Sequence, residues 1–291
     1  MKPKNIILVD ESSEGLRIDK YLKDKLNLPF SLLHKEFRKK NILINNKKVA
    51  GNHRLLKNDK VYLYREFKQY IIDDVEQKNI SFSLKKKIKD SIVFKDRNFL
   101  ILNKWGGIAS QGGSKVKVSI DDLIKLLGSI NDKPKLVHRL DKDTTGLLII
   151  ALNTDSARYF HQILSNQKIK KTYYAIVTNK PKNNQGIYTN DISDNKKTFK
   201  AQTKYKIIKK VKNNFYLLRL EPLSGRKHQI RLHCNLNNVP ILGDQKYNNG
   251  SRKLNIKNLF LHAGKLEFNT KNGKKIKVET DLPQHFNEYL N

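Results

Sequence analysis

The sequence predicts an α+β protein: a large domain with a mixed, largely antiparallel sheet, preceded by a small α+β domain. Three observations support this prediction. Beyond about residue 90, short apolar runs typical of strands outnumber segments with helical periodicity. Before about residue 65, two helix-periodic segments precede a hairpin pattern. The chain has 291 residues, enough for both domains. We therefore expect the small domain at residues 12–70, a linker at 71–87 and the large domain at 88–291.

The first elements belong to the small domain. Residues 1–10 contain a short apolar run that predicts a strand or an ordered arm. Ile18, Leu22 and Leu26 recur at helical spacing and predict a helix. Pro29 follows and ends it, because proline cannot continue a helix.

A second helix is predicted from Ser31, which can act as its N-cap. Leu33 and Phe37 would face inward, and the outward side is basic, with Lys35, Arg38, Lys39 and Lys40. Residues 42–49 predict a hairpin, because the asparagine pair in its middle tolerates positive φ at the turn. Residues 61–64 predict the strand that closes the unit.

The large domain begins with a predicted hairpin. Residues 92–94 and 99–102 are apolar strands, and residues 96–98 suit the turn between them. Residues 103–114 predict a loop whose glycine pairs let the backbone approach a ligand closely. The continuous apolar run at 147–152 predicts a buried strand.

Two helices and five strands are predicted in the remaining chain. Thr154 can cap a helix that runs to about Asn166. Another helix is predicted from Ser224 to about residues 237–238, before Pro240. Strands are predicted at 171–177, 199–208, 215–220, 260–262 and 276–278.

Charge is the strongest signal in the composition. The chain has 59 Lys and Arg against 27 Asp and Glu, a net charge of +32, and a pI near 10.0. Such a field attracts polyanions, which favours nucleic acid as the partner over a membrane surface or an acidic protein. The chain is also rich in Lys, Asn and Ile, so compositional bias is an alternative source of part of this charge.

The sequence also indicates a location. A single cysteine, Cys234, excludes an internal disulfide and fits a reducing compartment, so we expect the cytoplasm. No apolar stretch approaches the ~20 residues that a membrane helix needs. The apolar run near the N-terminus is too short for a secretory signal.

The most unusual stretch covers residues 138–146. Asp141 stands there among His138, Arg139 and Lys142, three groups that are or can be cationic. The predicted buried strand follows at once, so the cluster lies on a turn held by the core, where catalytic groups are common. On spacing alone, the simpler interpretation is a turn aspartate in a weak surface ion pair.

This stretch resembles the signature of the RluA family of RNA pseudouridine synthases, His-Arg-Leu-Asp followed after two residues by Thr-Ser/Thr-Gly. Two further matches follow in the family's order. Lys171 and Tyr173 match Lys-x-Tyr, and residues 225–233 resemble Gly-Arg-x-His-Gln-Ile-Arg-x-His. The sequence departs from the family at a few positions: Thr145 for Ser, Ser224 and Lys227 for Thr, Trp105 for Pro, and Gln111 for a frequent His.

The resemblance covers nearly the whole chain. Two short basic helices and a hairpin, at about residues 15–65, resemble an S4 RNA-binding domain, and the synthase resemblance covers about 90–285. Within the family, the Gly-Gly-Ser at 112–114 and the early S4-like unit favour the RluC type of the RluC/RluD branch.

The resemblance implies isomerisation of uridine to pseudouridine, with a role for each matched residue. Asp141 would be the catalytic residue, either attacking ribose C1′ or removing a proton from C2′. Arg231 would pair with it and favour its ionised form. Tyr173 would pack on the uracil and take the C5 proton directly or through water. Arg139 would fill the space of the displaced base. The simpler alternatives are a core tyrosine, and an arginine that contacts phosphate or solvent.

Further RNA-binding residues are expected in both domains: His138, Lys171, Arg226 and Gln229 near Asp141, and Lys35, Arg38 and Lys39 in the small domain. A uridine in structured RNA must leave its stack before a carboxylate can reach its sugar. The basic surface would offset that cost by binding phosphates.

The expected substrate is large-subunit (23S-type) ribosomal RNA or its assembly intermediates, bound by a monomer with no protein partner and no membrane contact. No cofactor or metal is expected. His228 and His233 are five residues apart instead of four, and Cys234 has no Cys-x-x-Cys partner. Two alternatives remain: a synthase that modifies transfer RNA, and a non-catalytic RNA-binding protein of ribosome assembly.

Overall fold

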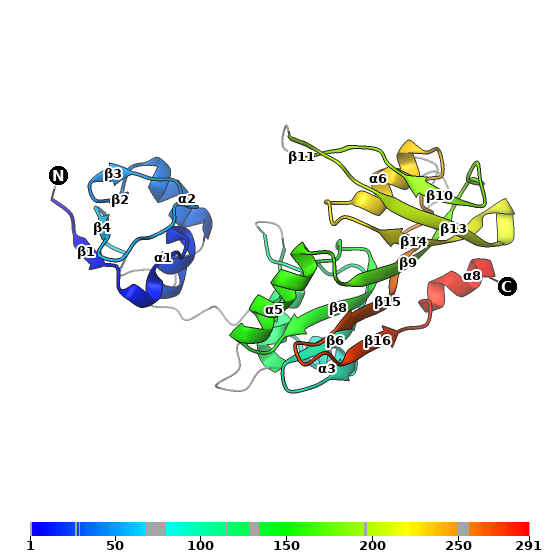
Figure 1. Ribbon diagram of the computed structural model, residues 1–291, viewed down its shortest axis with the longest axis horizontal. Coiled ribbons are helices and arrows are strands. Elements are labelled where there is room, and N and C mark those ends of the chain that lie inside the picture. The colour runs from blue at the N-terminus through cyan, green and yellow to red at the C-terminus, as the bar shows by residue number, and fades with distance from the viewer. Residues whose placement is uncertain are drawn as a thin grey trace. The chain divides into compact units, whose positions relative to one another are not determined.

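The structure is a computed structural model that describes residues 2–26, 28, 30–67, 80–113, 116–127, 134–194, 197–248 and 256–290. The chain divides into two compact units, Met1–Asn79 and Ile80–Asn291 (Figure 1). Among the helices in the described ranges, none is long and apolar enough to cross a bilayer.

Residues 71–79 of the predicted linker at 71–87 lie outside the described residues. The last residues of this linker are helical, which corrects the prediction for them. They begin α3 (Phe82–Asp90), where the Ser81 hydroxyl caps the helix by accepting a hydrogen bond from the Leu84 N–H. The three lysines that suggested a linker lie on the exposed side of this helix.

The first unit packs two helices against a four-stranded antiparallel sheet in the order β1-β4-β2-β3. Its elements are β1 (Asn5–Leu8), η1 (Glu11–Ser13), α1 (Ile18–Leu26), α2 (Phe30–Arg38), β2 (Ile42–Ile44), β3 (Lys47–Lys48) and β4 (Lys60–Leu63). The predicted helix pair and hairpin are confirmed, and Asn45 and Asn46 have φ of 48° and 62° at the turn. The helix α2 begins at Phe30, one residue before the predicted Ser31. The likeness of this unit to an S4 domain stays a prediction.

The second unit is built on a ten-stranded sheet with the main order β10-β13-β14-β9-β15-β8-β6-β5, in which β16 pairs with β15 and β7 with β8. Among the described strands, only β8 and β15 pair in parallel. The predicted mixed, largely antiparallel α+β domain is therefore confirmed. The strands are β5 (Ile92–Lys95), β6 (Phe99–Lys104), β7 (Lys135–Leu136), β8 (Thr145–Ala151), β9 (Lys170–Val177), β10 (Gln185–Tyr188), β13 (Thr203–Lys210), β14 (Tyr216–Pro222), β15 (Leu261–Asn269) and β16 (Lys275–Glu279).

Helices cover both faces of the sheet around β8 (Figure 1). Every residue of β8 is buried, and alternate side chains pack with α5 (Thr154–Ser165) on one face and with α3 and α4 (Ile120–Ile124) on the other. The loop that leads into β8, residues 137–144, therefore ends on a rigid core strand. The other helices are η3 (Lys125–Leu127), η4 (Lys212–Asn214), α6 (Gln229–Leu236), η5 (Gln284–Phe286) and α8 (Asn287–Leu290).

Gly146, near the start of β8, is required by the close approach of two strands. Its φ is 111°, a conformation that residues with side chains rarely adopt. A Cβ atom here would collide with the backbone of Ala263 on β15. Glycine therefore lets β15 run directly beside β8 where the loop 137–144 joins the sheet.

Three predicted boundaries are wrong. The strand expected at 199–208 is two strands, because β12 (Lys197–Phe199) pairs with β11 (Ile192–Asp194) in a separate ribbon and only β13 joins the main sheet. The helix expected from Ser224 begins at Gln229, since His228 has a left-handed φ of 54°. Asn153, not Thr154, caps α5 by accepting from the Ser156 N–H at 2.8 Å.

Candidate active site

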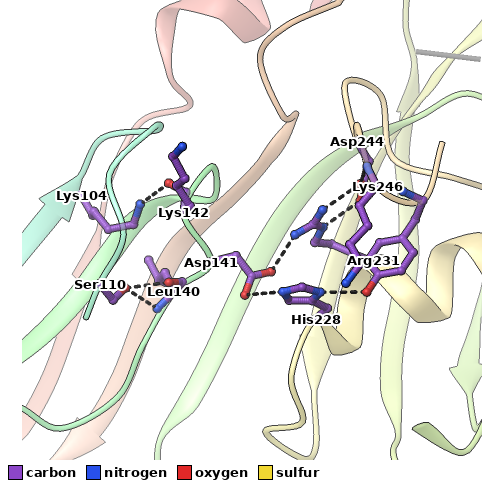
Figure 2. Close-up of polar contacts among 10 residues, drawn as sticks. Lys104, Ser110, Leu140, Asp141, Lys142, His228, Arg231, Asp244 and Lys246 are labelled. Carbon is purple, nitrogen blue, oxygen red and sulfur yellow. Dashed lines mark hydrogen bonds and ion pairs between the residues drawn. The ribbon is translucent and has the colours of Figure 1, made fainter. Parts of the chain in front are cut away.

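Residues 137–144, here called the Asp141 loop, are held by hydrogen bonds on both sides of Asp141 (Figure 2). The Ser110 hydroxyl donates to the Leu140 carbonyl at 2.6 Å and accepts from the Leu140 N–H at 3.0 Å. The Lys104 ammonium donates to the Lys142 carbonyl at 3.0 Å, and its other two hydrogen bonds go to carbonyls of its own loop. The end of β6 and the segment that follows it thus fix the backbone around Asp141.

Asp141 faces Arg231 on α6, 90 positions later in the sequence (Figure 2). The Nη1 atom of Arg231 donates to Oδ2 of Asp141 at 3.2 Å. Asp244 accepts two hydrogen bonds from the same guanidinium, both at 2.8 Å. The side chains of Asp141, Arg231 and Asp244 are 19%, 10% and 1% exposed, so the most accessible of the three groups is Asp141.

The contact between Arg231 and Asp244 favours the charged form of both groups. Burial by itself lowers the pKa of Arg231, but the hydrogen bonds and charge of Asp244, together with Asp141, raise it above its usual value. Burial by itself raises the pKa of Asp244, but Arg231 and the backbone N–H groups of Tyr247 and Lys246 lower it. Asp244 therefore fixes a permanent cation beside Asp141.

His228 completes the cluster. Its Nε2 atom lies 3.7 Å from Oδ1 of Asp141, and its Nδ1 atom is hydrogen-bonded to the Tyr247 hydroxyl at 2.8 Å. Burial lowers its pKa, and Arg231 and two lysines add to this, against the opposing effect of Asp141. His228 is therefore neutral at neutral pH, and the formal charge facing Asp141 comes from Arg231.

Asp141 lies where two cavities adjoin. The larger, here called the Asp141 cavity, has a volume of about 600 Å³ and is bordered by Tyr173, Lys171, Arg139 and Arg226 among others. The smaller has a volume of about 360 Å³ and reaches Asp244 and Lys246. Both include Asp141, His228 and Arg231 in their walls. The geometry offers a fixed, accessible carboxylate to a ligand the size of a nucleoside.

Known proteins are similar to this chain in sequence over nearly its full length. A family model described as RNA pseudouridylate synthase matches residues 98–236. The ribosomal large subunit pseudouridine synthase C of Rickettsia bellii (strain RML369-C) is 36% identical over 300 residues, which cover 97% of this chain and 99% of the relative. This chain belongs to the RNA pseudouridine synthase family. A synthase of the same name from Buchnera aphidicola subsp. Schizaphis graminum is 31% identical over 99% of this chain and 96% of its own.

Solved structures of other pseudouridine synthases have a similar fold. Human RNA pseudouridylate synthase domain containing 4 has a TM-score of 0.59 and 25% identity, over 72% of this chain and 94% of that one. Human RNA pseudouridylate synthase domain containing 1 has a TM-score of 0.57 and 22% identity, over 66% and 82% of the two chains, and shows the shared fold alone.

Most of the predicted site residues of this synthase line the Asp141 cavity. Tyr173 and Lys171 reach it from β9, which crosses the centre of the sheet. Burial, and then the charge of Asp141, raise the pKa of Tyr173, so its hydroxyl stays protonated. Burial lowers the pKa of Lys171. Arg139 and Arg226 are exposed at the same cavity, and the Arg226 guanidinium lies 4.9 Å from the centre of the Phe199 ring.

Two of the predicted RNA-binding residues make hydrogen bonds within the protein. His138 accepts a hydrogen bond from the Ile149 N–H at 3.0 Å, and burial, followed by the charge of Lys171, lowers its pKa to about 3. It is therefore neutral, which corrects the prediction of a possible cation. The buried Gln229 side chain donates to Gln202 and Thr203, and accepts from Ser224 and Arg226. These four hydrogen bonds organise the turn before α6, and contact of Gln229 with RNA stays a prediction.

The three basic residues predicted to bind RNA in the first unit, Lys35, Arg38 and Lys39, are exposed on or just after α2. Arg38 also donates to the His34 carbonyl at 3.3 Å. Their side chains are thus on the outer side of the helix, as the spacing of Leu33 and Phe37 predicts, and their contact with RNA stays a prediction.

Sequence reasoning missed Asp244, Ser110 and the positioning role of Lys104. A signal for Asp244 exists, because it is an acidic residue 13 positions after Arg231, and a buried arginine needs its charge to be paired. The loop of Lys104 was recognised from its glycines alone. Nothing in the sequence reveals that Ser110 bonds the backbone of a residue 30 positions later.

Proposed function

We propose that this pseudouridine synthase acts on large-subunit ribosomal RNA and that Asp141 starts the isomerisation. The substrate class follows the names of the Rickettsia and Buchnera relatives, which match this chain over almost all of its length. The observation that supports Asp141 is its position: an accessible carboxylate, 3.2 Å from a fixed guanidinium, in the wall of a cavity of about 600 Å³.

The reaction exchanges one bond for another within a single nucleotide. The bond between uracil N1 and ribose C1′ breaks, the uracil turns, a bond forms between C5 and C1′, and the C5 proton moves to N1. Asp141 begins this either as a nucleophile at C1′ or as a base at C2′. In both cases the carboxylate must be ionised, and the neighbouring Arg231 donates a hydrogen bond to it from a guanidinium that Asp244 keeps in place.

Tyr173 is assigned to contact with the uracil. Its pKa is raised, so a phenolate is rare at neutral pH and the hydroxyl is a poor base for the C5 proton. We therefore favour packing against the base, with proton transfer through water, over direct proton removal. Arg139, exposed at the same cavity, is assigned to the space that the flipped nucleotide leaves in the RNA.

The substrate class is tested by mapping pseudouridines in total RNA from cells with and without the protein. Loss of specific pseudouridines from large-subunit ribosomal RNA, restored by the wild-type chain and not by Asp141→Asn, is the expected result. The matched control is Asp155→Asn, which removes an exposed carboxylate on α5 and should restore them. Loss confined to transfer RNA would contradict the substrate assignment, and rescue by Asp141→Asn would support a non-catalytic role.

A further inference from the structure

A third cavity, with a volume of about 630 Å³, borders the Asp141 loop at Asp143 and extends to the C-terminal segment at His285. It is here called the Trp105 cavity, because Trp105, the single tryptophan of the chain, forms part of its wall. Lys104, which bonds the backbone of the Asp141 loop, lies beside this tryptophan. None of the roles described so far uses the indole ring.

The Trp105 cavity combines an aromatic surface with cations. The ammonium of Lys87, on α3, lies 4.8 Å from the centre of the Trp105 ring. Lys257, which lies far from Lys87 in the sequence, adds a second exposed cation to the wall. Asp143 and Asp281 also line it, and buried Lys104 adds a third positive charge, so positive charge is in excess.

Shared wall residues place this cavity next to the site of Asp141, with the smaller cavity between them. The Trp105 cavity shares Asp143 and Leu259 with the cavity of about 360 Å³. That cavity in turn shares Asp141 and Arg231 with the Asp141 cavity. A strand whose target nucleotide occupies the Asp141 cavity can therefore continue along the Asp141 loop to Trp105.

We propose that the Trp105 cavity binds an unpaired nucleotide that flanks the target uridine, with its base against the Trp105 ring and its phosphate near Lys87 and Lys257. This inference rests on the proposed function for the RNA that passes the Asp141 loop. Aromatic rings bind unpaired bases of any sequence through stacking, and adjacent lysines bind the connecting phosphates. The site would thus hold the RNA on one side of the flipped nucleotide without reading its sequence.

The test uses the full-length enzyme and an unmodified transcript of large-subunit ribosomal RNA. Because Trp105 is the single tryptophan, its fluorescence reports on this cavity alone. We expect saturating transcript to protect Trp105 from quenching by acrylamide. Trp105→Ala should raise KM about tenfold with little change in kcat, since stacking on one aromatic ring contributes roughly 5- to 150-fold to affinity. Trp105→Phe should restore most of the loss.

Two lysines on α3 distinguish RNA binding at the Trp105 cavity from a general effect of positive charge on the surface. Lys87 lies over the Trp105 ring, whereas Lys85 is exposed on the same helix and does not line the cavity. Lys87→Ala should raise KM several-fold more than Lys85→Ala. Unchanged quenching with transcript bound, or wild-type KM in both Trp105→Ala and Lys87→Ala, would overturn the proposal while leaving the function intact. A transcript that protects Trp105 without being modified would support this site and contradict the proposed substrate.

Discussion

At the scale of single residues, Arg231 organises the site. Its guanidinium is hydrogen-bonded both to a buried carboxylate, Asp244, and to a more exposed one, Asp141. Asp244 is almost completely buried and takes two hydrogen bonds from the guanidinium, and Asp141 takes one at the cavity wall. A buried ion pair is weak evidence for net stability, but it fixes the position of a charge. Here the fixed charge lies beside the group that must be ionised for the reaction.

The first prediction concerns Asp244→Asn. The change leaves the guanidinium with one charged partner, so we expect a loss of about 3–5 kcal/mol in the free energy of unfolding, because a buried pair has been broken. The value of kcat should fall at least tenfold even at temperatures where the variant is fully folded. Urea unfolding and single-turnover kinetics measure the two effects. A wild-type kcat in the folded variant would show that catalysis by Asp141 does not require Asp244 to hold Arg231 in place.

The second prediction concerns pH and His138. Its pKa is about 3 in the folded chain, against 6.5 for the free side chain, so the unfolded state binds more protons between these values. This group therefore does not lower the free energy of unfolding above pH 6.5. As pH falls from 6.5 toward 3, it lowers that free energy by up to about 1.4 kcal/mol per pH unit. The variant His138→Gln keeps an acceptor for the Ile149 N–H without the titration. Its unfolding free energy should fall less steeply below pH 6.5 than that of the wild type; parallel curves would contradict the account.

At the scale of elements, the site depends on three segments that meet at one point: the loop after β6, the Asp141 loop before β8, and the start of α6. The buried strand β8 and the helices around it were predictable, because continuous apolar runs and helical spacing report burial directly. The split of the strand at 199–208 and the start of α6 were not. Both depend on side chains that satisfy the backbone locally, such as Gln229, whose amide bonds the turn before α6, and periodicity does not detect these.

The third prediction tests the junction of the Asp141 loop with the sheet. Gly146→Ala should lower the free energy of unfolding by about 3 kcal/mol or more, because it adds a backbone collision to an unfavourable φ. The matched control is Gly273→Ala, where φ is 77° and the new Cβ would have nothing within 4 Å. That variant should lose only about 1–2 kcal/mol, the cost of the left-handed backbone. Chemical denaturation of both variants measures the difference, and equal losses would refute the collision.

At the scale of the whole molecule, the net charge of +32 is much larger than the charge carried by the few residues around Asp141. The sequence predicted the family and the pairing partner of Asp141 through three ordered motifs, and it predicted the sheet through its short apolar runs. It did not predict Asp244, Ser110 or the neutral state of His138, since these depend on burial and on contacts between distant segments. The positive charge was predictable from the composition. Its role in RNA binding can be tested by measuring affinity at several salt concentrations.

The fourth prediction is a steep salt dependence of RNA affinity. Each phosphate contact should contribute about 0.7–0.9 to the slope of log affinity against log salt concentration, because binding releases counterions. Removing two basic residues of α2, as in Lys35→Ala with Arg38→Ala, should reduce that slope by about 1.4–1.8. The control is Lys57→Ala in the same unit, whose ammonium is paired with Glu11 at 2.8 Å. An unchanged slope in the α2 variant would contradict RNA binding by this helix.

The most direct test of the central claim is the single-turnover rate constant of Asp141→Asn on unmodified ribosomal RNA, measured with enzyme in saturating excess. The substitution keeps the shape of the side chain and a hydrogen-bond acceptor for Arg231, but removes the charge. We expect a fall on the order of 10²–10⁴-fold or more in pseudouridine formation, with RNA affinity within about twofold of the wild type. Pseudouridine formation at the wild-type rate by this variant would contradict the assignment of Asp141 as the catalytic group.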